Sequence, residues 1–263
     1  MKIDVDIRGV GICAPGLADW NCLLDAFTGT ELNVNQPLEM GSLLSIRDRR
    51  RAPVTVKLTF SAAQQACDMA GITPDKPIAI FSTAMGDMDI SDYMCRILAH
   101  SPDQLSPTRF HNSVHNAASG YWSIGVGAKG DVTALCGGPD SATVGLIEAL
   151  SRISDTEQPV LLVIYDGIAT GPMHDLFPTV YPFCAAFLLS RPVAAPPLAR
   201  LSAEPGRGPD SVPPMPASLI ERIADNPAAR VLPLLALIGG QTNRPVMLGA
   251  EQGPGILFRR REA

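Results

Sequence analysis

The chain has 263 residues, of which 46% are hydrophobic and 18% are charged, and its net charge at pH 7 is −5. This length suits one large domain or two small ones, and the apolar share indicates a well-filled core or a covered interface. The negative charge argues against a nucleic-acid partner, which calls for a basic surface. A basic run over 47–51 (RDRRR) is interpreted as a solvated loop or a protein-docking patch.

Strand and helix patterns alternate through the first two-thirds of the chain. In chain order, the predicted elements are strand 3–12, helix 19–27, helix 53–70, strand 77–83, helix 88–98, helix 112–127, strand 131–135, helix 140–153, strand 158–165 and strand 181–189. Residues 30–50 are expected to form a loop. Because strands alternate with helices, the pattern predicts a layered α/β fold with largely parallel pairing in the sheet.

The composition shifts at Arg191. Residues 191–216 are crowded with Pro, Ala and Gly, which is typical of a loop or linker. Helices over 217–224 and 228–238 and a short strand over 255–258 are expected after it. We therefore predict one domain over 1–190, followed over 191–263 by a Pro-rich linker and a short C-terminal extension that packs on it.

The six cysteines are scattered through apolar sequence without a CxxC pair, which is typical of reduced thiols in the cytoplasm. Of the four histidines, only His111 and His115 share a helical face. Their spacing permits a metal pair, but no third ligand accompanies them, so neither a metal site nor a cofactor is predicted. The start of the chain is too polar for a signal peptide and no apolar run reaches membrane-spanning length, so we expect cytoplasmic localisation and no membrane span.

The stretch Ser106–Leu150 bears most directly on function. Its strand leads into a sharp turn at 136–139 (CGGP) and then into the helix 140–153, where Asp140 or Ser141 can serve as the N-cap. That helix is apolar on nearly every face, so we expect it to be buried between layers. Enzymes often mount a nucleophile on such a turn, which makes Cys136 a candidate. The alternative interpretation is a buried cysteine that acts as a small hydrophobe.

The sequence HNSVHNAASGYWSIGVGAKG, followed by DVTALCGGPDSATVGLIEAL, resembles the β-ketoacyl synthase family of the thiolase fold. In that family an Asn-Ala-Ala-Gly-type helix precedes a Thr-Ala-Cys-type elbow that carries the acyl-accepting cysteine. Thr133 and Ala134 match the first two elbow positions, and Leu135 stands where the resemblance places the cysteine. Cys136 comes one residue later, and adjacent residues at a strand end point in opposite directions.

The resemblance covers residues 1 to about 190, the N-terminal half of a synthase. It implies an α/β, thiolase-like layered fold, essentially that N-terminal half with a shortened, divergent C-terminal part. The family's second half supplies two histidines and a lysine, whereas residues 191–263 contain neither residue type. Since nucleophile and base act as a unit, the resemblance implies no catalytic residues for condensation here.

Among relatives of the synthases, the chain resembles the chain-length factor, the inactive partner subunit of type II polyketide systems such as the aryl-polyene-like ones. This resemblance implies a heterodimer with an active, full-length ketosynthase, with an acyl carrier protein as an indirect partner, in polyketide or fatty-acid-like biosynthesis. The residues expected at the partner interface and acyl tunnel are Phe110, His111, Asn112, Val114, His115, Asn116, Leu135 and Cys136. Two alternatives stay open: a small stand-alone acyltransferase or thioesterase that uses Cys136 with His115, and a purely structural binding module.

Overall fold

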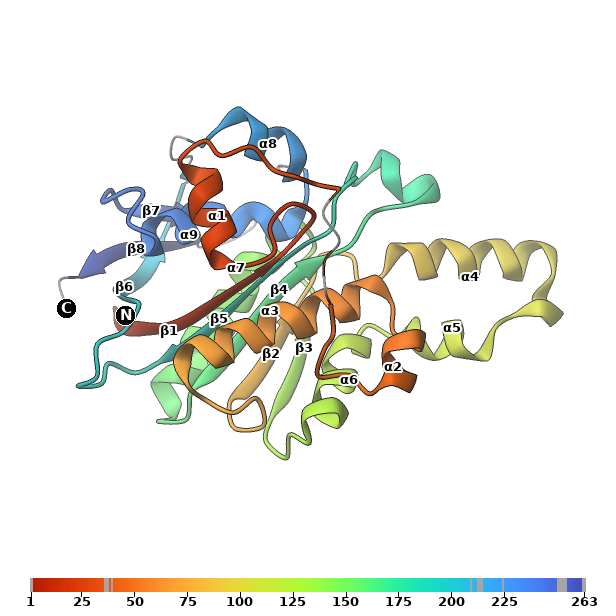
Figure 1. The fold of residues 1–263 in the computed structure, drawn as a ribbon, viewed down its shortest axis with the longest axis horizontal. Helices are drawn as coiled ribbons and strands as arrows, with labels where there is room; N and C mark the ends of the chain where they lie inside the picture. The colour runs from red at the N-terminus through yellow and green to blue at the C-terminus, as the bar shows by residue number, and fades with distance from the viewer. Residues whose placement is uncertain are drawn as a thin grey trace.

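The computed structural model describes residues 2–35, 38, 40–208, 210–211, 215–223, 225–249 and 255–261. In this part of the chain, eight strands form a single sheet with the order β3-β2-β4-β5-β1-β6-β8-β7 (Figure 1). The strands are β1 (Ile3–Cys13), β2 (Ile78–Ser82), β3 (Val132–Leu135), β4 (Val160–Asp166), β5 (Phe183–Ser190), β6 (Ala199–Gly206), β7 (Val246–Leu248) and β8 (Gly255–Arg261). The layered α/β architecture expected from the sequence is confirmed.

The strand pairing corrects the expectation of a largely parallel sheet. β2 pairs in parallel with β3 and β4, but every other neighbouring pair is antiparallel. Parallel neighbours need a long crossover connection, which helices provide before β3 and β4. No α-helix precedes β5 or β6 in the connection from the strand before it. β5 instead pairs antiparallel with β4, and β6 pairs antiparallel with β1.

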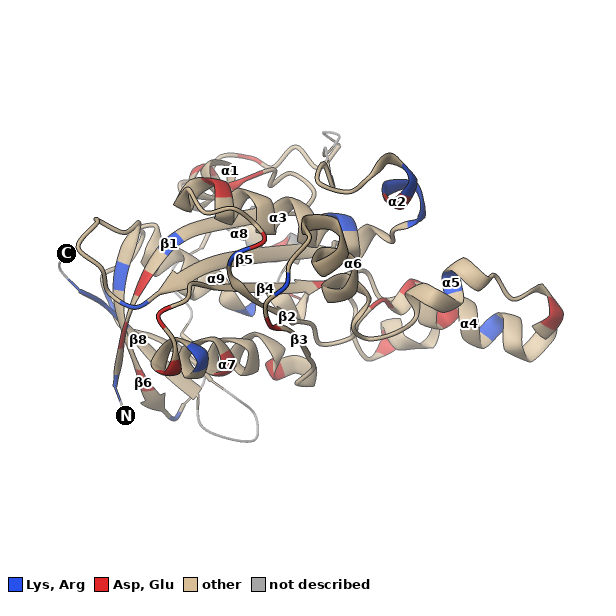
Figure 2. Ribbon diagram, turned by 90° about the horizontal axis from the view of Figure 1, so that it is seen from below, with Lys and Arg blue, Asp and Glu red and all other residues tan. Residues whose placement is uncertain are grey.

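Helices cover both faces of the sheet. The longer helices are α1 (Trp20–Phe27), α3 (Val54–Ala70), α4 (Met88–His100), α6 (Ala117–Val126) and α7 (Ser141–Asp155). The shorter ones are α2 (Ile46–Arg51), α5 (Pro107–Asn112), α8 (Ala217–Ile223) and α9 (Leu232–Ile238), with the 3₁₀ turns η1 (Pro102–Gln104), η2 (Gly138–Asp140), η3 (Gly171–Asp175) and η4 (Pro227–Val231). α3 and α6 cover one face and α7 the other (Figures 1 and 2).

The central strands are apolar throughout because each of their faces meets a different core. In β4, Leu162 packs in the core cluster that contains α7, and its neighbour Leu161 packs in the cluster that contains α3 and α6. In β2, Ile80 likewise packs in the cluster that contains α7, and Phe81 packs in the cluster that contains α3 and α6. Side chains alternate between the faces of a strand, so burial of both faces requires an unbroken apolar run.

Two sequence expectations about helices need correction. The predicted helix 112–127 starts later in the structure, as α6 (Ala117–Val126); residues 113–116 form a turn after α5, which ends at Asn112. Residues 46–51, expected to be loop, form α2, whose N-cap Ser45 accepts a hydrogen bond from the backbone N–H of Asp48 at 3.1 Å. Together α4 and α5 extend away from the body of the protein (Figures 1 and 2).

The C-terminal third continues the sheet. Residues 199–206, expected to be linker, form β6, which pairs with β1 on one side and β8 on the other. Leu201 and Ala203 are buried in the main core, and Arg200 holds the fully buried carboxylate of Asp6 through a contact of 2.6 Å. Prolines and glycines around this short alternating segment mask its strand pattern in the sequence.

Residues from this third also cover α7. The turn η4 and the helix α9 share one apolar core with α7, and the Thr143 hydroxyl donates to the Gly249 carbonyl at 2.9 Å. Ile147 nevertheless stays 44% exposed, so α7 is not enclosed on every face as expected. In the described residues, no helix is both long enough and apolar enough to cross a membrane.

Close packing of α3 on β1 generates a first prediction. A Cβ atom on Gly11 would lie 1.9 Å from the carbonyl oxygen of Ala62 in α3. Gly11→Ala should therefore lower the free energy of unfolding by about 3 kcal/mol, because the helix must move off the strand. Urea unfolding of the full chain measures the change.

Gly120→Ala is the matched control. Gly120 lies in α6, where an added Cβ meets no heavy atom within 4 Å. Alanine is the better helix former, so this variant should be neutral or more stable by up to about 1 kcal/mol. Equal effects of the two substitutions would contradict the role assigned to the α3–β1 contact.

Candidate functional site

The elbow lies where β3 ends and α7 begins. Leu135 is half-buried and packs against the main core, while the next residue, Cys136, is exposed. The turn that follows is held by Ser141, whose hydroxyl accepts from the Gly137 N–H at 2.8 Å and contacts the Thr83 carbonyl at 2.9 Å. Leu135 thus packs against the core, whereas Cys136 is exposed as a residue and its thiol reaches the Ala84 carbonyl.

Among the residues that the structure describes, Cys136 has no side-chain partner that would activate it. Its thiol contacts the backbone carbonyl oxygen of Ala84 at 3.4 Å. Within the described ranges, neither an imidazole nor a carboxylate forms a hydrogen bond with this sulfur. A nucleophilic thiol needs a neighbouring base or a lowered pKa. The exposure of Cys136 also corrects the alternative of a buried cysteine.

Asp166 joins the ends of β2 and β4 close to the elbow. Its Oδ1 accepts hydrogen bonds from the Thr83 hydroxyl at 2.6 Å and from the N–H groups of Ala84 and Met85 at 2.9 and 3.1 Å. Burial raises the pKa of this carboxyl to about 7, against the opposing effect of these hydrogen bonds. Asp166 thus fixes the loop whose Ala84 carbonyl contacts Cys136.

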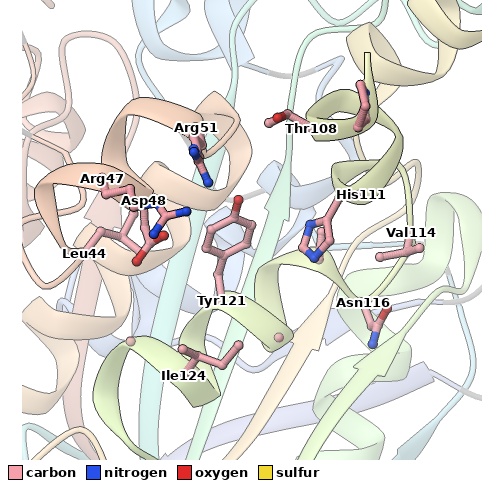
Figure 3. Close-up of a pocket in the computed structure, with 14 residues that line it drawn as sticks. Leu44, Arg47, Asp48, Arg51, Thr108, His111, Val114, Asn116, Tyr121 and Ile124 are labelled. Atoms are coloured by element: carbon pink, nitrogen blue, oxygen red, sulfur yellow. The ribbon is translucent and has the colours of Figure 1, made fainter. Parts of the chain in front are cut away.

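A hollow of about 570 Å³ opens between α2 on one side and α5 and α6 on the other (Figure 3). Its lining residues are Leu44, Arg47, Asp48, Arg51, Pro107, Thr108, His111, Val114, Asn116, Ala117, Gly120, Tyr121, Ile124 and Gly125. Charged side chains come from α2, and apolar ones come from α6 and the preceding turn. The hollow therefore offers one basic wall and one mostly apolar wall.

Hydrogen bonds tie these walls together. The Tyr121 hydroxyl donates to Asn112 Oδ1 at 3.0 Å, and Asn112 Nδ2 donates to the Arg51 carbonyl at 3.0 Å. The His111 ring lies edge-on to Tyr121, with 6.4 Å between ring centroids. Burial and then the charge of Asp48 raise the pKa of the Tyr121 phenol, so it stays neutral and donates its proton. Buried Asn112 thereby fixes α2, α5 and α6 relative to one another.

The structure brings some of the predicted interface residues together and separates others. His111, Val114 and Asn116 line the hollow, and Asn112 is the buried link beside it. Asn112, Val114 and His115 also line a narrow cleft next to Asp87 and Tyr165. Phe110, Leu135 and Cys136 lie outside the hollow; Phe110 is 58% exposed on α5, and the other two are at the elbow.

The surface around the hollow is apolar and open. Ile124 is 82% exposed and Val114 is 52% exposed. A second hollow of about 520 Å³ lies on the other side of Arg51 and Thr108 and includes the exposed side chains of Val54 and Ile168. Strand β3 forms the adjacent edge of the sheet. Large exposed apolar patches of this kind mark interaction surfaces.

Sequence reasoning missed the α2 side of the hollow. From the sequence, the run 47–51 is expected to be a solvated loop or a protein-docking patch, and Tyr121 is expected only to belong to a helix. The spacing of Ser45 and Asp48 was the available signal, because Ser with an acidic residue three positions later marks a helix N-terminus. In the described residues, no group of three or more His, Cys, Asp or Glu side chains could hold a metal ion.

The comparisons agree with this architecture. The model of the β-ketoacyl synthase N-terminal domain matches residues 30–215, which is more than half of the chain. The chain therefore belongs to the β-ketoacyl synthase family. No curated protein matched the sequence in a separate search.

Several solved structures share the fold. One is the ketosynthase ApeO in complex with its chain length factor ApeC from Xenorhabdus doucetiae, with a TM-score of 0.71, 22% identity, and 98% of this chain and 100% of that chain covered. A second is the ishigamide ketosynthase/chain length factor, with a TM-score of 0.72, 15% identity and coverage of 98% and 99%. A third is a β-ketoacyl synthase from Burkholderia phymatum STM815, with a TM-score of 0.61, 14% identity and coverage of 92% and 71%. At these identities the likeness establishes the thiolase-like fold.

The raised pKa of Asp166 predicts a pH-dependent stability. The folded protein holds this proton up to about pH 7, whereas an unfolded aspartate releases it near pH 4. The stabilisation by Asp166 is therefore complete below about pH 4 and is lost as the pH rises to about 7, a loss on the order of 4 kcal/mol. Chemical unfolding of the wild type and Asp166→Asn across this range isolates the contribution, because other groups cancel in the difference. A difference that is constant with pH would contradict it.

Proposed function

We propose that this chain is a non-catalytic, ketosynthase-like subunit, a chain-length factor. It pairs with an active full-length ketosynthase and shapes that partner's acyl tunnel in type II polyketide or fatty-acid-like biosynthesis, with aryl-polyene-like systems as the expected class. The observation that carries the proposal is the elbow, where Leu135 takes the position expected for the acyl-accepting cysteine and packs against the core.

The chemistry of the elbow supports a subunit without condensing activity. Cys136 comes one residue later and is exposed, and its thiol contacts a backbone carbonyl; among the described residues no base forms a hydrogen bond with it. The segment after residue 190 contributes strands to the sheet and helices to the α7 core, and it contains no histidine or lysine. This segment therefore lacks the residue types that the resemblance assigns to the condensing reaction.

The size of the protein also supports its assignment as a chain-length factor. This chain matches 100% and 99% of the chains in two structures whose names include a chain length factor, but only 71% of the Burkholderia synthase. The matched chains in those two complexes are therefore about the size of this one. A structure of a type II acyl-carrier protein in complex with its ketosynthase also matches, which is consistent with a carrier protein as the partner's substrate donor.

The open surface supports pairing. β3 lies at an edge of the sheet, and in the described part of the chain its backbone bonds only to β2. Ile124 and Val114 are exposed next to the hollow, which is open to solvent. A ketosynthase seated here would pair with the strand edge, bury the apolar side chains and close the hollow.

Within such a complex, this chain acts by filling space. Val114 lines both the large hollow and the narrow cleft beside it, so its side-chain volume sets the space between them. Protein interiors are close-packed, and a growing acyl chain stops when the next unit no longer fits. Phe110 and Leu135 are the other side chains assigned to this role.

The test uses the complex co-expressed with its ketosynthase. Val114→Ala should shift the product distribution toward longer chains by about one extender unit, and Val114→Phe should shorten it, because the two changes enlarge and reduce the available volume. Mass spectrometry of the extracted products measures chain length, and size-exclusion chromatography checks that the complex persists. Unchanged products from an intact complex would contradict the tunnel role and favour a purely structural binding module.

The remaining alternative, an acyltransferase or thioesterase that uses Cys136, draws support from the exposure of the thiol. We expect no stable Cys136-dependent acyl adduct when the full chain is incubated with an acyl thioester, since no base within the described ranges forms a hydrogen bond with the sulfur. Intact-mass measurement detects the adduct, and Cys95→Ser controls for modification of the other exposed thiol. An adduct that survives Cys95→Ser and disappears in Cys136→Ser would overturn the non-catalytic assignment.

A further inference from the structure

Arg230 of η4 links the C-terminal third of the chain to the elbow. Its Nη1 donates to Asp140 Oδ1 and to the Pro139 carbonyl, each at 2.7 Å. Its Nε donates to Asp210 Oδ2 at 2.8 Å. The Arg230 side chain is only 24% exposed, so water screens these charged contacts in part and not fully. One guanidinium thus holds the turn η2, which leads into α7, against the C-terminal third.

These contacts belong to a ring that closes through the backbone. Asp210 Oδ1 accepts a hydrogen bond from the Gly249 N–H at 2.6 Å. The Gly249 carbonyl in turn accepts from the buried Thr143 hydroxyl at 2.9 Å. Thr143 lies in the first turn of α7. The ring therefore runs from the N-terminus of α7 out to the C-terminal third and back to the first turn of the same helix.

Asp140 is the N-cap of α7, one of the two N-caps expected from the sequence. An aspartate at this position ordinarily accepts a hydrogen bond from a backbone N–H in the first turn of its helix. Here the side chain makes no capping hydrogen bond and accepts from Arg230 instead. The start of α7 is therefore secured by a contact with the C-terminal third in place of its own side-chain cap.

The turn that carries Arg230 is itself anchored at the end of β4. The buried Asn226 Nδ2 donates to the carbonyls of Asp166 and Tyr181 at 3.1 and 3.0 Å. Its Oδ1 accepts from the Ala228 N–H at 2.9 Å. Buried polar groups that are satisfied in this way keep a single arrangement. Arg230 therefore extends from a turn with a fixed position.

We propose that Arg230 is a positioning residue, which fixes the elbow from the C-terminal third so that Leu135 keeps one position before a partner chain binds. Asp166 holds the loop that the elbow contacts, and Arg230 holds the turn into α7. The fixing of the elbow is a property of this chain alone. Its consequence for acyl chain length rests on the proposed function, in which Leu135 is a tunnel side chain.

Hydrogen exchange of the full chain, followed by mass spectrometry of peptides within 135–145, tests the fixing of the elbow. Arg230→Met keeps an apolar stem but leaves Asp140 and Asp210 without their shared guanidinium. The Gly137 and Asp140 N–H groups, which are bonded within the elbow, should then exchange about tenfold faster. Arg230→Lys keeps the charge without the planar fork, so it should accelerate this exchange by about threefold.

The matched control is Arg152→Met, near the other end of α7. Arg152 also contacts two carboxylates, Glu148 at 2.7 Å and Asp131 at 3.4 Å. This variant should leave exchange within 135–145 no more than about twofold from that of the wild type. Equal acceleration by Arg152→Met and Arg230→Met would overturn the proposal. So would equal acceleration of the elbow and of β5 in the Arg230 variants, because that result assigns Arg230 to overall stability.

A second measurement tests the link to chain length, in the complex co-expressed with its ketosynthase. Arg230→Met should broaden the product distribution and lower the share of the main product about twofold, because Leu135 no longer keeps one position. Mass spectrometry measures the products, and size-exclusion chromatography checks that the complex persists. Faster elbow exchange with unchanged products would contradict the tunnel role of Leu135 in the proposed function. Unchanged elbow exchange would overturn the positioning role of Arg230, whatever the products are.

Discussion

The whole structure depends on the burial of β2, β4 and β5 on both faces. Leu161 and Leu162 point into different cores, so two layers of helix are required before any of these strands is stable. One layer is α3 with α6, and α3 approaches β1 so closely that only glycine fits at positions 9 and 11. The other layer is α7, which the C-terminal third helps to cover through η4 and α9. Residues after 190 thus contribute to the core on the α7 face of the sheet.

The same constraint explains the site. The ends of β2 and β4 are joined by Asp166, and the loop it fixes meets the elbow after β3. The exposed side chains of Val114 and Ile124 beside the hollow, by contrast, belong to neither core. The hydrogen-bonded ends of β2 and β4 therefore lie close to a surface with exposed apolar side chains. The proposed function assigns this exposed surface to a partner chain.

Much of the fold could be predicted from the sequence, because a strand buried on both faces has an uninterrupted run of apolar residues. The run around Ile80 is apolar without interruption, and the family resemblance through Thr133 and Ala134 fixed the fold class. Strand pairing could not be predicted, since alternation of side chains does not say which neighbour a strand joins. The sequence does not predict β6, because prolines and glycines surround it. It does not predict the hollow either, because Arg51 and Tyr121 are connected only through Asn112 in the folded chain.

The two ends of the sheet differ in a way that bears on assembly. At the β7 end, Ser211 exchanges hydrogen bonds with the backbone N–H and C=O of Met247, and Asp210 accepts from the Gly249 N–H. The β3 end has no such cap within the described residues. A sheet with one covered edge strand can add a further strand only at its other edge. If the proposed pairing occurs through β3, it would therefore stop at two chains instead of growing into a fibre.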